Sequence, residues 1–449
     1  MNLDDTIAAL ATPPGRSGIG IVRLSGPLAR RFAERCFLSS HCLQPRKLTL
    51  GVIRDPDTSE RIDEVLMAWM PAPHSYTCQD VVEVQTHGGG QVLQAVLALA
   101  LCQGARLAEP GEFTLRAFLN GRIDLAQAEA VQDIILAKTQ AALRIAQGQL
   151  GGRLSQEVGA LRSRLLSVYA QLQASIDFGD DVAERDLVPD LSLALEHLGR
   201  LLSGAQQGIL YRNGVRVVII GRPNVGKSRL LNALLGSERA IVTPIAGTTR
   251  DTLQESIDLG GIPVELVDTA GLAETADPIE QLGIARAHQA LEAADVLLLV
   301  VDASIPPSPA DQAAAQAANG RSALLVLNKA DLVPLYDYDE LLPGVEHVAT
   351  SALTGAGLDS LREAIRQLIL RGTMVSDDST LVSNPRHQGL LARVQQSLLR
   401  AQETAAAGGY PDMLAADLQE ALNALGEITG ETASNELLAT IFSTFCIGK

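Results

Sequence analysis

The chain has 449 residues, 47% of them hydrophobic and 20% charged, and its formal net charge at pH 7 is −16. This length suggests roughly two to four domains, each large enough to bury a core. The negative charge argues against a broad nucleic-acid-binding face, because phosphate binding draws on clustered lysines and arginines. Any contact with RNA should therefore be local or shared with a partner.

The cysteine count and the hydropathy of the chain indicate its compartment. The five cysteines are an odd number and form no C-x-x-C pair, which argues against a disulfide framework and against structural zinc. The first ten residues, MNLDDTIAAL, are acidic where a secretion signal would be basic. No apolar run approaches the ~20 residues that span a bilayer. We expect a soluble, cytoplasmic protein with no membrane association.

Residues 1–118 are predicted to form an α/β domain. The expected elements are strands at 6–12 and 20–24, a helix at 29–36, a strand at 81–84 and a helix at 91–102. Clusters of glycine and proline between these elements are typical of turns. His87 stands in one such cluster. Because no companion ligand lies near it in the sequence, we interpret His87 as a hydrogen-bonded turn residue rather than a metal ligand.

Helical periodicity dominates residues 119–212 and returns in residues 373–449, with helices expected at 390–401 and 414–425. Apolar residues spaced by three and four predict amphipathic faces. Two such sets are Ile134, Ala137, Ala141 and Ile145, and Leu161, Leu165, Val168 and Leu172. Residues 213–372 instead alternate strand and helix, as a doubly wound sheet does. The predicted architecture is a discontinuous helical domain into which a second α/β domain is inserted.

The inserted domain begins with a phosphate-loop motif, GRPNVGKS, at residues 221–228. An apolar strand is predicted before it and an amphipathic helix after it, which is the context that this motif requires. The helix N-terminus and the loop N–H groups then face one anion. Gly221 and Gly226 permit the tight turn, Lys227 can bridge the β- and γ-phosphates, and the Ser228 hydroxyl can bind Mg²⁺.

Two further motifs are expected to surround the phosphates and the metal. The DTAG segment at 268–271 follows a predicted strand, so Asp268 can hold Mg²⁺ through water and Gly271 can donate its N–H to the γ-phosphate. The GTTRD segment at 247–251 is predicted to be a switch loop, and Thr249 is the residue chosen to reach the metal. Next to the DTAG glycine stands Leu272, where Ras-like proteins use a glutamine to position the attacking water.

The base is predicted to be guanine. The NKAD segment at 328–331 ends a predicted strand, and the Asp331 carboxylate can accept hydrogen bonds from two guanine donors that adenine lacks. A loop at 351–353 can complete the pocket with a backbone N–H. Five motifs in this order define a Ras-like P-loop GTPase domain that binds GTP and GDP. The predicted nucleotide contacts are Asn224, Val225, Gly226, Lys227, Ser228, Arg229, Thr243, Pro244, Ile245, Ala246, Gly247, Thr248, Thr249, Asp268, Thr269, Ala270, Gly271, Asn328, Lys329, Ala330, Asp331, Ser351, Ala352 and Leu353.

The whole chain resembles the MnmE (TrmE) family of tRNA-modification GTPases. The resemblance rests on the GTPase motifs, on the terminal FCIGK, and on the amino-terminal segments ATPPGRSGIGIVRLSG, PHSYT…DVVEVQTHGG and PGEFTLRAFLNGRIDLAQAEA. It implies work with an FAD-dependent partner, MnmG, in a heterotetramer-type complex that installs an aminomethyl-type group at C5 of the wobble uridine of certain tRNAs. The one-carbon unit would come from a tetrahydrofolate derivative (5-formyl or methylene) bound by the amino-terminal domain, which also makes a homodimer.

The resemblance also implies roles for individual residues. It assigns K⁺ to Asn224, Thr243, Ile245 and Thr248, Mg²⁺ to Ser228 and Thr249, the tetrahydrofolate derivative to Arg23, Glu83, Arg122 and Lys449, and catalysis to Glu280, Lys227 and Cys446. In this family K⁺ supplies the charge of an arginine finger when G domains dimerise. Some members carry Lys in place of Arg122, which keeps the charge but changes the hydrogen-bonding geometry.

Alternatives remain for two of these residues and for the function. Glu280 is equally interpreted as an exposed glutamate at a helix start, where the helix dipole favours it. Cys446 is more often a small buried hydrophobe than a reactive thiol. The alternative function is a regulatory GTPase switch associated with RNA or ribosomes, although no KH-like GXXG element follows the G domain. A scaffold with a vestigial nucleotide site conflicts with the intact Lys227, Ser228, Thr249 and Asp331.

Overall fold

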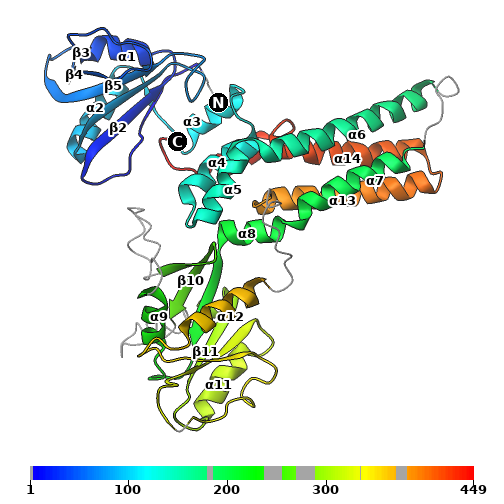
Figure 1. The fold of residues 1–449 in the computed structure, drawn as a ribbon. Helices are drawn as coiled ribbons and strands as arrows, with labels where there is room; N and C mark the ends of the chain where they lie inside the picture. The colour runs from blue at the N-terminus through cyan, green and yellow to red at the C-terminus, as the bar shows by residue number, and fades with distance from the viewer. Residues whose placement is uncertain (1–3, 179–185, 237–254, 269–288, 334, 371–381) are drawn as a thin grey trace.

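The computed structural model describes residues 4–178, 186–236, 255–268, 289–333, 335–370 and 382–449. Within these ranges the chain forms an N-terminal α/β domain, a bundle of long helices and a second α/β domain (Figure 1). The chain passes from the helical bundle into the second α/β domain after residue 213, and it is back in the bundle at residue 385. No helix in the described ranges is long and apolar enough to cross a membrane.

The N-terminal domain contains a sheet of seven described strands. Their order in the sheet is β3-β4-β5-β6-β2-β1-β7. Its strands are β1 (Ile7–Leu10), β2 (Ser17–Ser25), β3 (Phe37–Leu38), β4 (Thr49–Arg54), β5 (Arg61–Met70), β6 (Val81–Gly88) and β7 (Arg106–Leu107). Its helices are α1 (Ala29–Cys36), α2 (Gly90–Cys102) and α3 (Glu112–Leu119). Val22 of β2 and Val84 of β6 are fully buried in one core with Phe32 of α1 and Val96 of α2.

The sequence predicted β1, β2, β6, α1 and α2 but missed β3, β4, β5, β7 and α3. In β5 the predominantly polar beginning and the partly exposed end hide the alternation expected of a half-buried strand. His87, predicted to be a turn residue, instead lies within β6, next to its last residue, Gly88. The prediction that it is hydrogen-bonded is confirmed, since its Nδ1 lies 2.8 Å from Asp63 Oδ1.

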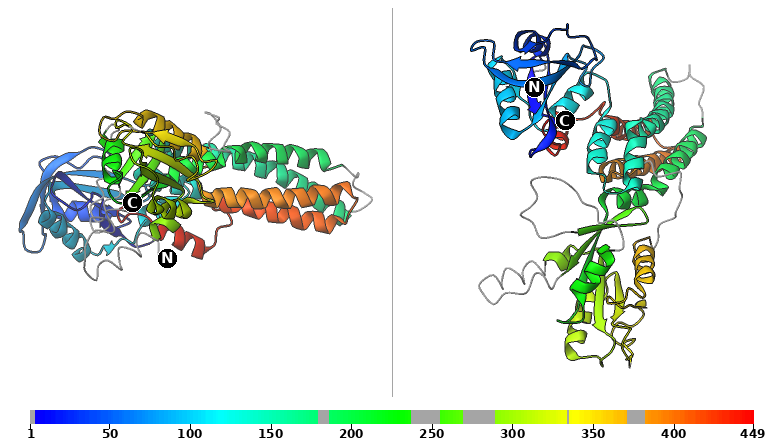
Figure 2. Two further views of the ribbon diagram at one scale, coloured as in Figure 1. Left: turned by 90° about the horizontal axis from the view of Figure 1, so that it is seen from below. Right: turned by 60° about the vertical axis from the view of Figure 1, so that its left-hand side comes forward.

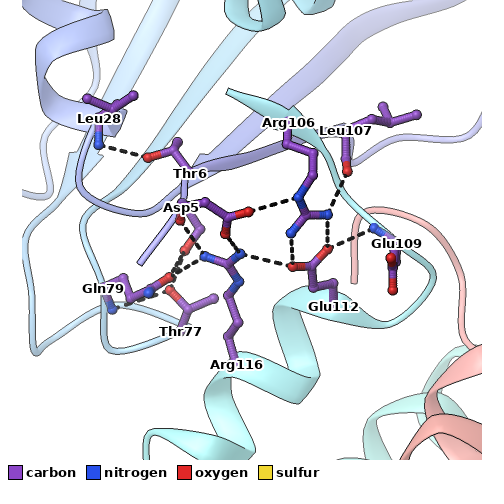
Figure 3. A network of polar contacts seen from close by, with 11 residues as sticks. Asp5, Thr6, Leu28, Thr77, Gln79, Arg106, Leu107, Glu109, Glu112 and Arg116 are labelled. Carbon is purple, nitrogen blue, oxygen red and sulfur yellow. Dashed lines mark hydrogen bonds and ion pairs between the residues drawn. The ribbon is translucent and has the colours of Figure 1, made fainter. Parts of the chain in front are cut away.

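A buried ion network fixes α3 to the start of the sheet (Figure 3). Arg116 of α3 is fully buried and donates to Asp5 and, over 2.9 Å, to Glu112 Oε1. Arg106 donates to the same Glu112 oxygen over 2.7 Å. Burial would raise the pKa of Glu112, but the hydrogen bonds from Arg106 and Arg116 hold it below its usual value. Because buried charges are tolerated only when paired, this network sets the position of α3.

The helical domain combines segments from both sides of the inserted domain (Figures 1 and 2). Its first helices are α4 (Leu125–Leu136), α5 (Gln140–Leu150), α6 (Arg153–Phe178), α7 (Val188–Ser203) and α8 (Ala205–Asn213). Its later helices are α13 (Pro385–Ala406), α14 (Pro411–Thr429) and α15 (Asn435–Ser443). The predicted apolar face of α6, Leu161 to Leu172, is confirmed: it lies in one core with Leu391 and Leu398 of α13.

The other predicted apolar face, through Ile134, Ala137, Ala141 and Ile145, is wrong as a continuous helix. Helix α4 ends at Leu136, and Ala137 is its extended C-cap. Thr139 then caps α5, because its hydroxyl oxygen accepts a hydrogen bond from the Ala142 N–H. The same hydroxyl donates to the carbonyl of Gly261 over 2.7 Å, so a contact with the inserted domain stabilises the break.

One buried carboxylate joins the two halves of the helical domain. Glu129 of α4 accepts hydrogen bonds from Asn384 Nδ2 and Arg386 Nε, each over 3.0 Å, and its Oε2 lies 2.8 Å from His387 Nε2. Burial would raise the pKa of Glu129, but the interactions with His387 and Arg386 lower it to about 2. The carboxylate is therefore ionised throughout the physiological range.

The inserted domain contains a second sheet, whose described strands run in the order β13-β12-β11-β8-β10-β9. The strands are β8 (Val215–Ile220), β9 (Glu255–Leu259), β10 (Ile262–Asp268), β11 (Val296–Asp302), β12 (Ala323–Asn328) and β13 (His347–Ala349). The described helices are α9 (Lys227–Gly236), α11 (Pro309–Ala318) and α12 (Leu358–Leu370). All neighbouring strands are parallel except β9 with β10. Strands β8 and β11 are almost continuously apolar, as strands covered on both faces are.

We expect Glu129→Gln to lower the free energy of unfolding at pH 7 by about 3 kcal/mol, because it leaves Arg386 without its buried partner. The folded-state pKa of Glu129 lies below the unfolded value of about 4.3. The carboxylate thus stabilises the fold above that unfolded value, and its contribution is lost as the pH falls toward 2. Urea unfolding followed by helical circular dichroism at pH 7 and pH 3 measures both effects. Glu403→Gln on the exposed side of α13 is the control, and equal stability of the two variants at pH 7 would contradict the prediction.

Candidate functional site

The phosphate loop lies between β8 and α9, at the carboxyl end of the central strand, where doubly wound sheets bind ligands. Its two glycines are required by close contacts. Gly221 has φ of 146°, and a Cβ there would lie 2.3 Å from the carbonyl oxygen of Val300. Gly226 has φ of 98°, and a Cβ would lie 2.5 Å from Asn328 Nδ2. Larger residues would therefore displace the neighbouring strand or Asn328.

The polar groups predicted to meet the phosphates and the metal lie together. Lys227 is buried, and its ammonium donates to the carbonyl oxygens of Gly221 and Arg222, each over 2.9 Å. The Ser228 hydroxyl donates to Asp268 Oδ2 over 2.6 Å. A hydroxyl and a carboxylate are the oxygen donors that Mg²⁺ prefers, so these two residues fit the predicted metal. The side chain of Asn224 is exposed on the loop, and its backbone is left-handed, with φ of 65°.

Asn328 links the phosphate loop to the predicted base pocket. It is almost fully buried; its Nδ2 donates to the carbonyl of Val225 over 2.7 Å, and its Oδ1 accepts from the Ala352 N–H over 3.1 Å. The neighbouring Lys329, with φ of 63°, donates to Asp302 Oδ2 over 2.6 Å. Asp331 is exposed at the end of this segment. The side chains of Asn328 and Lys329 are therefore bound within the protein, while the carboxylate of Asp331 is exposed.

Sequence reasoning missed Asp302 as a member of this site. Burial would raise the pKa of Asp302, but hydrogen bonds from Lys329 and Ser304 lower it, so the carboxylate is held ionised. Asp302 ends the run VLLLVVD, in which it is the only polar residue. A lone aspartate at the end of an apolar strand beside the NKAD strand was the available signal.

Part of the predicted site lies outside the described residues. This holds for Thr243, Pro244, Ile245, Ala246, Gly247, Thr248, Thr249, Thr269, Ala270, Gly271, Leu272 and Glu280. Of the remaining residues predicted to contact the nucleotide, Arg229 and Leu353 are exposed, and Ser351 is buried.

A second predicted site lies on the N-terminal sheet. Arg23 of β2 and Glu83 of β6 are cross-strand neighbours, and their Nε and Oε1 atoms are 2.8 Å apart. Arg23 Nη1 also donates to the carbonyl of Gly448 over 2.9 Å, which brings the end of the chain to this sheet. The pKa of Lys449 is lowered, mainly by burial and also by the positive charge of Arg23. Three of the four predicted folate residues therefore meet at one place.

The fourth residue, Arg122, is held against Tyr76. Its guanidinium stacks on the ring of Tyr76, with Cζ 4.8 Å from the ring centroid, and Nη1 donates to the Tyr76 carbonyl over 2.8 Å. Tyr76 packs against the core cluster that contains Phe113, and Arg23 lies over the Phe113 ring. Cys446 is exposed nearby on the C-terminal segment. Over the described residues, no group of three His, Cys, Asp or Glu side chains is arranged to hold a metal ion.

The fold and the nucleotide site define a P-loop GTPase. Protein-family models extend this class to the other domains: residues 6–122 match the model described as GTP-binding protein TrmE N-terminus, and residues 125–446 match the MnmE helical domain. A tRNA modification GTPase MnmE of Chloroflexus aurantiacus is 53% identical over 453 residues, and one of a Roseiflexus species is 47% identical over 463; both alignments cover 100% of each chain. The chain therefore belongs to the MnmE (TrmE) family of tRNA modification GTPases.

Solved structures of other GTPases also resemble part of the chain. The structure of Era from Aquifex aeolicus bound to GDP·AlF₄⁻ is 30% identical, covers 41% of this chain and 67% of its own, and gives a TM-score of 0.28.

We expect Asn328→Ala to weaken GDP binding roughly tenfold to a hundredfold, because it removes two buried hydrogen bonds of about 1 kcal/mol each. The phosphate loop and the 351–353 loop would then lose their common support. A titration with a fluorescent GDP analogue measures the affinity. Asn319→Ala, at the exposed end of α11, is the matched control, and equal affinities of the two variants would contradict the prediction.

Proposed function

We propose that this tRNA modification GTPase acts with an FAD-dependent partner, MnmG, to install an aminomethyl-type group at C5 of the wobble uridine. In this proposal the one-carbon unit comes from a tetrahydrofolate derivative bound by the N-terminal domain. The observation that carries it is the meeting of Arg23, Glu83 and Lys449. Cationic groups suit the glutamate tail of a folate, and a carboxylate suits the donor edge of a pterin ring. Tetrahydrofolate would supply the carbon that the uridine receives.

The proposed binding roles follow from how each polar group is held. Glu83 is fixed by Arg23 and offers its second oxygen to a ring donor. Arg122 is stacked on Tyr76, so its guanidinium is oriented before a ligand arrives. Lys449 has a lowered pKa because it is partly buried beside Arg23, and an anionic ligand would compensate that positive charge. Cys446 remains a proposed catalytic thiol.

For the GTPase reaction we propose that Lys227 binds the β- and γ-phosphates and that Ser228 and Asp268 hold Mg²⁺, directly and through water. Asp331 would accept the guanine donors. Asn224 would contribute its side-chain oxygen to a K⁺ site, where the cation supplies the charge that an arginine finger supplies elsewhere. The remaining proposed K⁺ and catalytic residues, with Glu280 among them, belong to segments outside the described residues. G-domain dimerisation and a constitutive homodimer through the N-terminal domain complete the proposal.

The function is tested in a strain whose own gene of this family has been deleted. We expect this chain to restore the C5 modification of wobble uridines, measured by mass spectrometry of digested tRNA. The Asp331→Asn variant should restore less of it, because an amide no longer accepts both guanine donors. If the chain hydrolyses GTP but wobble uridines stay unmodified with the FAD partner present, the proposed chemistry is wrong and a regulatory switch is favoured.

The role of Asn224 predicts a dependence on the monovalent cation. GTP hydrolysis should be faster in K⁺ than in Na⁺ at equal ionic strength, and Asn224→Ala should remove most of that difference. Initial rates of phosphate release in the two salts measure it. Asn435→Ala, at the exposed start of α15, should keep the wild-type salt preference. Equal rates in both salts for the wild-type chain would remove Asn224 from the proposed role.

A further inference from the structure

The last residues of the sequence lie against the N-terminal sheet, in a segment that we call the C-terminal tail (446–449). The chain is anchored just before it, because Phe442 and Phe445 are buried in a core cluster with Leu115 of α3. The tail itself is held by its backbone. The Gly111 N–H donates to the Cys446 carbonyl over 3.3 Å, and Arg23 Nη1 donates to the Gly448 carbonyl over 2.9 Å.

Gly448 lies so close to strand β1 that no other residue fits without displacement. Its φ is 94°, and a Cβ would lie 2.2 Å from the carbonyl oxygen of Leu10 and 3.1 Å from Ala11 Cα. Both atoms belong to backbone, so neither can move aside as the end of a side chain would. The close contact between the backbone of the tail and the backbone of the sheet therefore requires glycine at position 448.

The side chain of Arg23 is oriented so that it holds the C-terminal tail close to the sheet. Its Nε is bound to Glu83 Oε1 on the neighbouring strand, and its guanidinium lies 5.7 Å from the centroid of the Phe113 ring. With one side fixed, the planar guanidinium presents Nη1 to the Gly448 carbonyl. A lysine carries its three N–H donors on one nitrogen rather than on a rigid planar fork, so it would not hold the Glu83 carboxylate and the Gly448 carbonyl in this geometry.

The charges of Arg23 and Glu83 have opposite effects on Lys449, the last residue of the tail. Lys449 is partly buried, and the positive charge of Arg23 acts against its ammonium, while Glu83 acts in its favour. The hydrogen bond from Arg23 to the Gly448 carbonyl holds the tail at this place in addition to these opposing charge effects.

We propose that Arg23 and Gly448 are positioning residues that clamp the C-terminal tail onto the N-terminal sheet, so that Cys446 and Lys449 are presented to the ligand of this site. In this proposal Arg23 influences ligand binding by positioning the tail, in addition to the direct contact with the ligand that the proposed function assigns to it. The identity of the ligand as a folate rests on the proposed function, but the clamp is a property of the protein alone.

The clamp can be tested by trimming the tail of the 449-residue chain with carboxypeptidase B, which removes a terminal lysine only when the end of the chain is free to enter its active site. We expect Arg23→Gln and Gly448→Ala to lose Lys449 about tenfold faster than the wild-type chain, the scale set by losing one charged hydrogen bond. Mass spectrometry of the intact protein follows the reaction. Rates for Gly448→Ala are divided by those of a peptide with the same altered end.

Two further variants separate clamping from charge. Arg23→Lys keeps the positive charge but loses the fork, so it should be trimmed nearly as fast as Arg23→Gln. Arg30→Gln, on the exposed side of α1, should be trimmed at the wild-type rate. If Arg23→Gln and Gly448→Ala are trimmed at the wild-type rate, the clamp does not exist. Trimming as slow in Arg23→Lys as in the wild type would also overturn it.

A parallel titration with 5-formyltetrahydrofolate distinguishes the two proposals. If the wild-type chain binds the folate, both clamp variants should bind it more weakly, because Lys449 is no longer held at the site. If the wild-type chain does not bind it, the proposed folate function fails, while the trimming rates still decide whether the clamp exists.

Discussion

The rest of the structure depends on one shared apolar core in the helical domain. Helices α6 and α7 bury their leucines against α13 and α14, and residues such as Leu165 and Leu391 are fully enclosed there. Isolated amphipathic helices are marginal in water, so neither half gains a stable bundle without the other. Their packing closes the chain around the inserted domain. It also carries residues 382–449 back toward the beginning of the chain, where Glu129 meets Arg386 and the C-terminal tail meets the N-terminal sheet.

Strand β10 ties the nucleotide site to this bundle. At one end Asp268 accepts the hydrogen bond of Ser228 in the phosphate loop. At the other end, the turn before the strand places the Gly261 carbonyl on the Thr139 hydroxyl of the helical domain. A Cβ at Gly261, where φ is 93°, would lie 2.8 Å from Ala141 Cβ, so the turn fits closely. One strand of the sheet therefore contacts both the predicted metal-binding residues and the helix that Thr139 caps.

The sequence allowed the phosphate loop, with the strand before it and the helix after it, to be predicted because their sequence pattern is local. Gly221, Gly226 and Lys227 lie within one motif of eight residues, the strand before it is almost continuously apolar, and the helix after it buries Leu230, Leu234 and Leu235 at helical spacing. The break between α4 and α5 could not be predicted in this way, since it depends on Thr139 reaching the distant Gly261. Strands β4 and β5 were missed because their partners, rather than their own pattern, make them strands.

The pairing of Arg23 with the C-terminal tail could not be predicted from local sequence patterns either, because it joins residues that are distant in the sequence. Its two partners are separated by 425 positions in the sequence, and no spacing rule links them. The resemblance to a known family placed Arg23 and Lys449 at one site, but it assigned both as ligands. The hydrogen bond to the Gly448 carbonyl gives Arg23 a contact with the protein itself, which residue types alone do not reveal.

The split of the helical domain has a consequence for how the chain is made. Helices α6 and α7 leave the ribosome before the whole inserted domain, and α13 and α14 leave after it. At a synthesis rate of roughly 5–20 residues per second, the interval is on the order of ten to thirty seconds. Throughout it α6 and α7 can pack only against each other, and the apolar surface that they later bury against α13 and α14 stays exposed, which is the kind of surface that holding chaperones bind. The inserted domain has its own apolar core and is synthesised completely during this interval. The helical bundle can form only afterwards, when α13 and α14 have been synthesised.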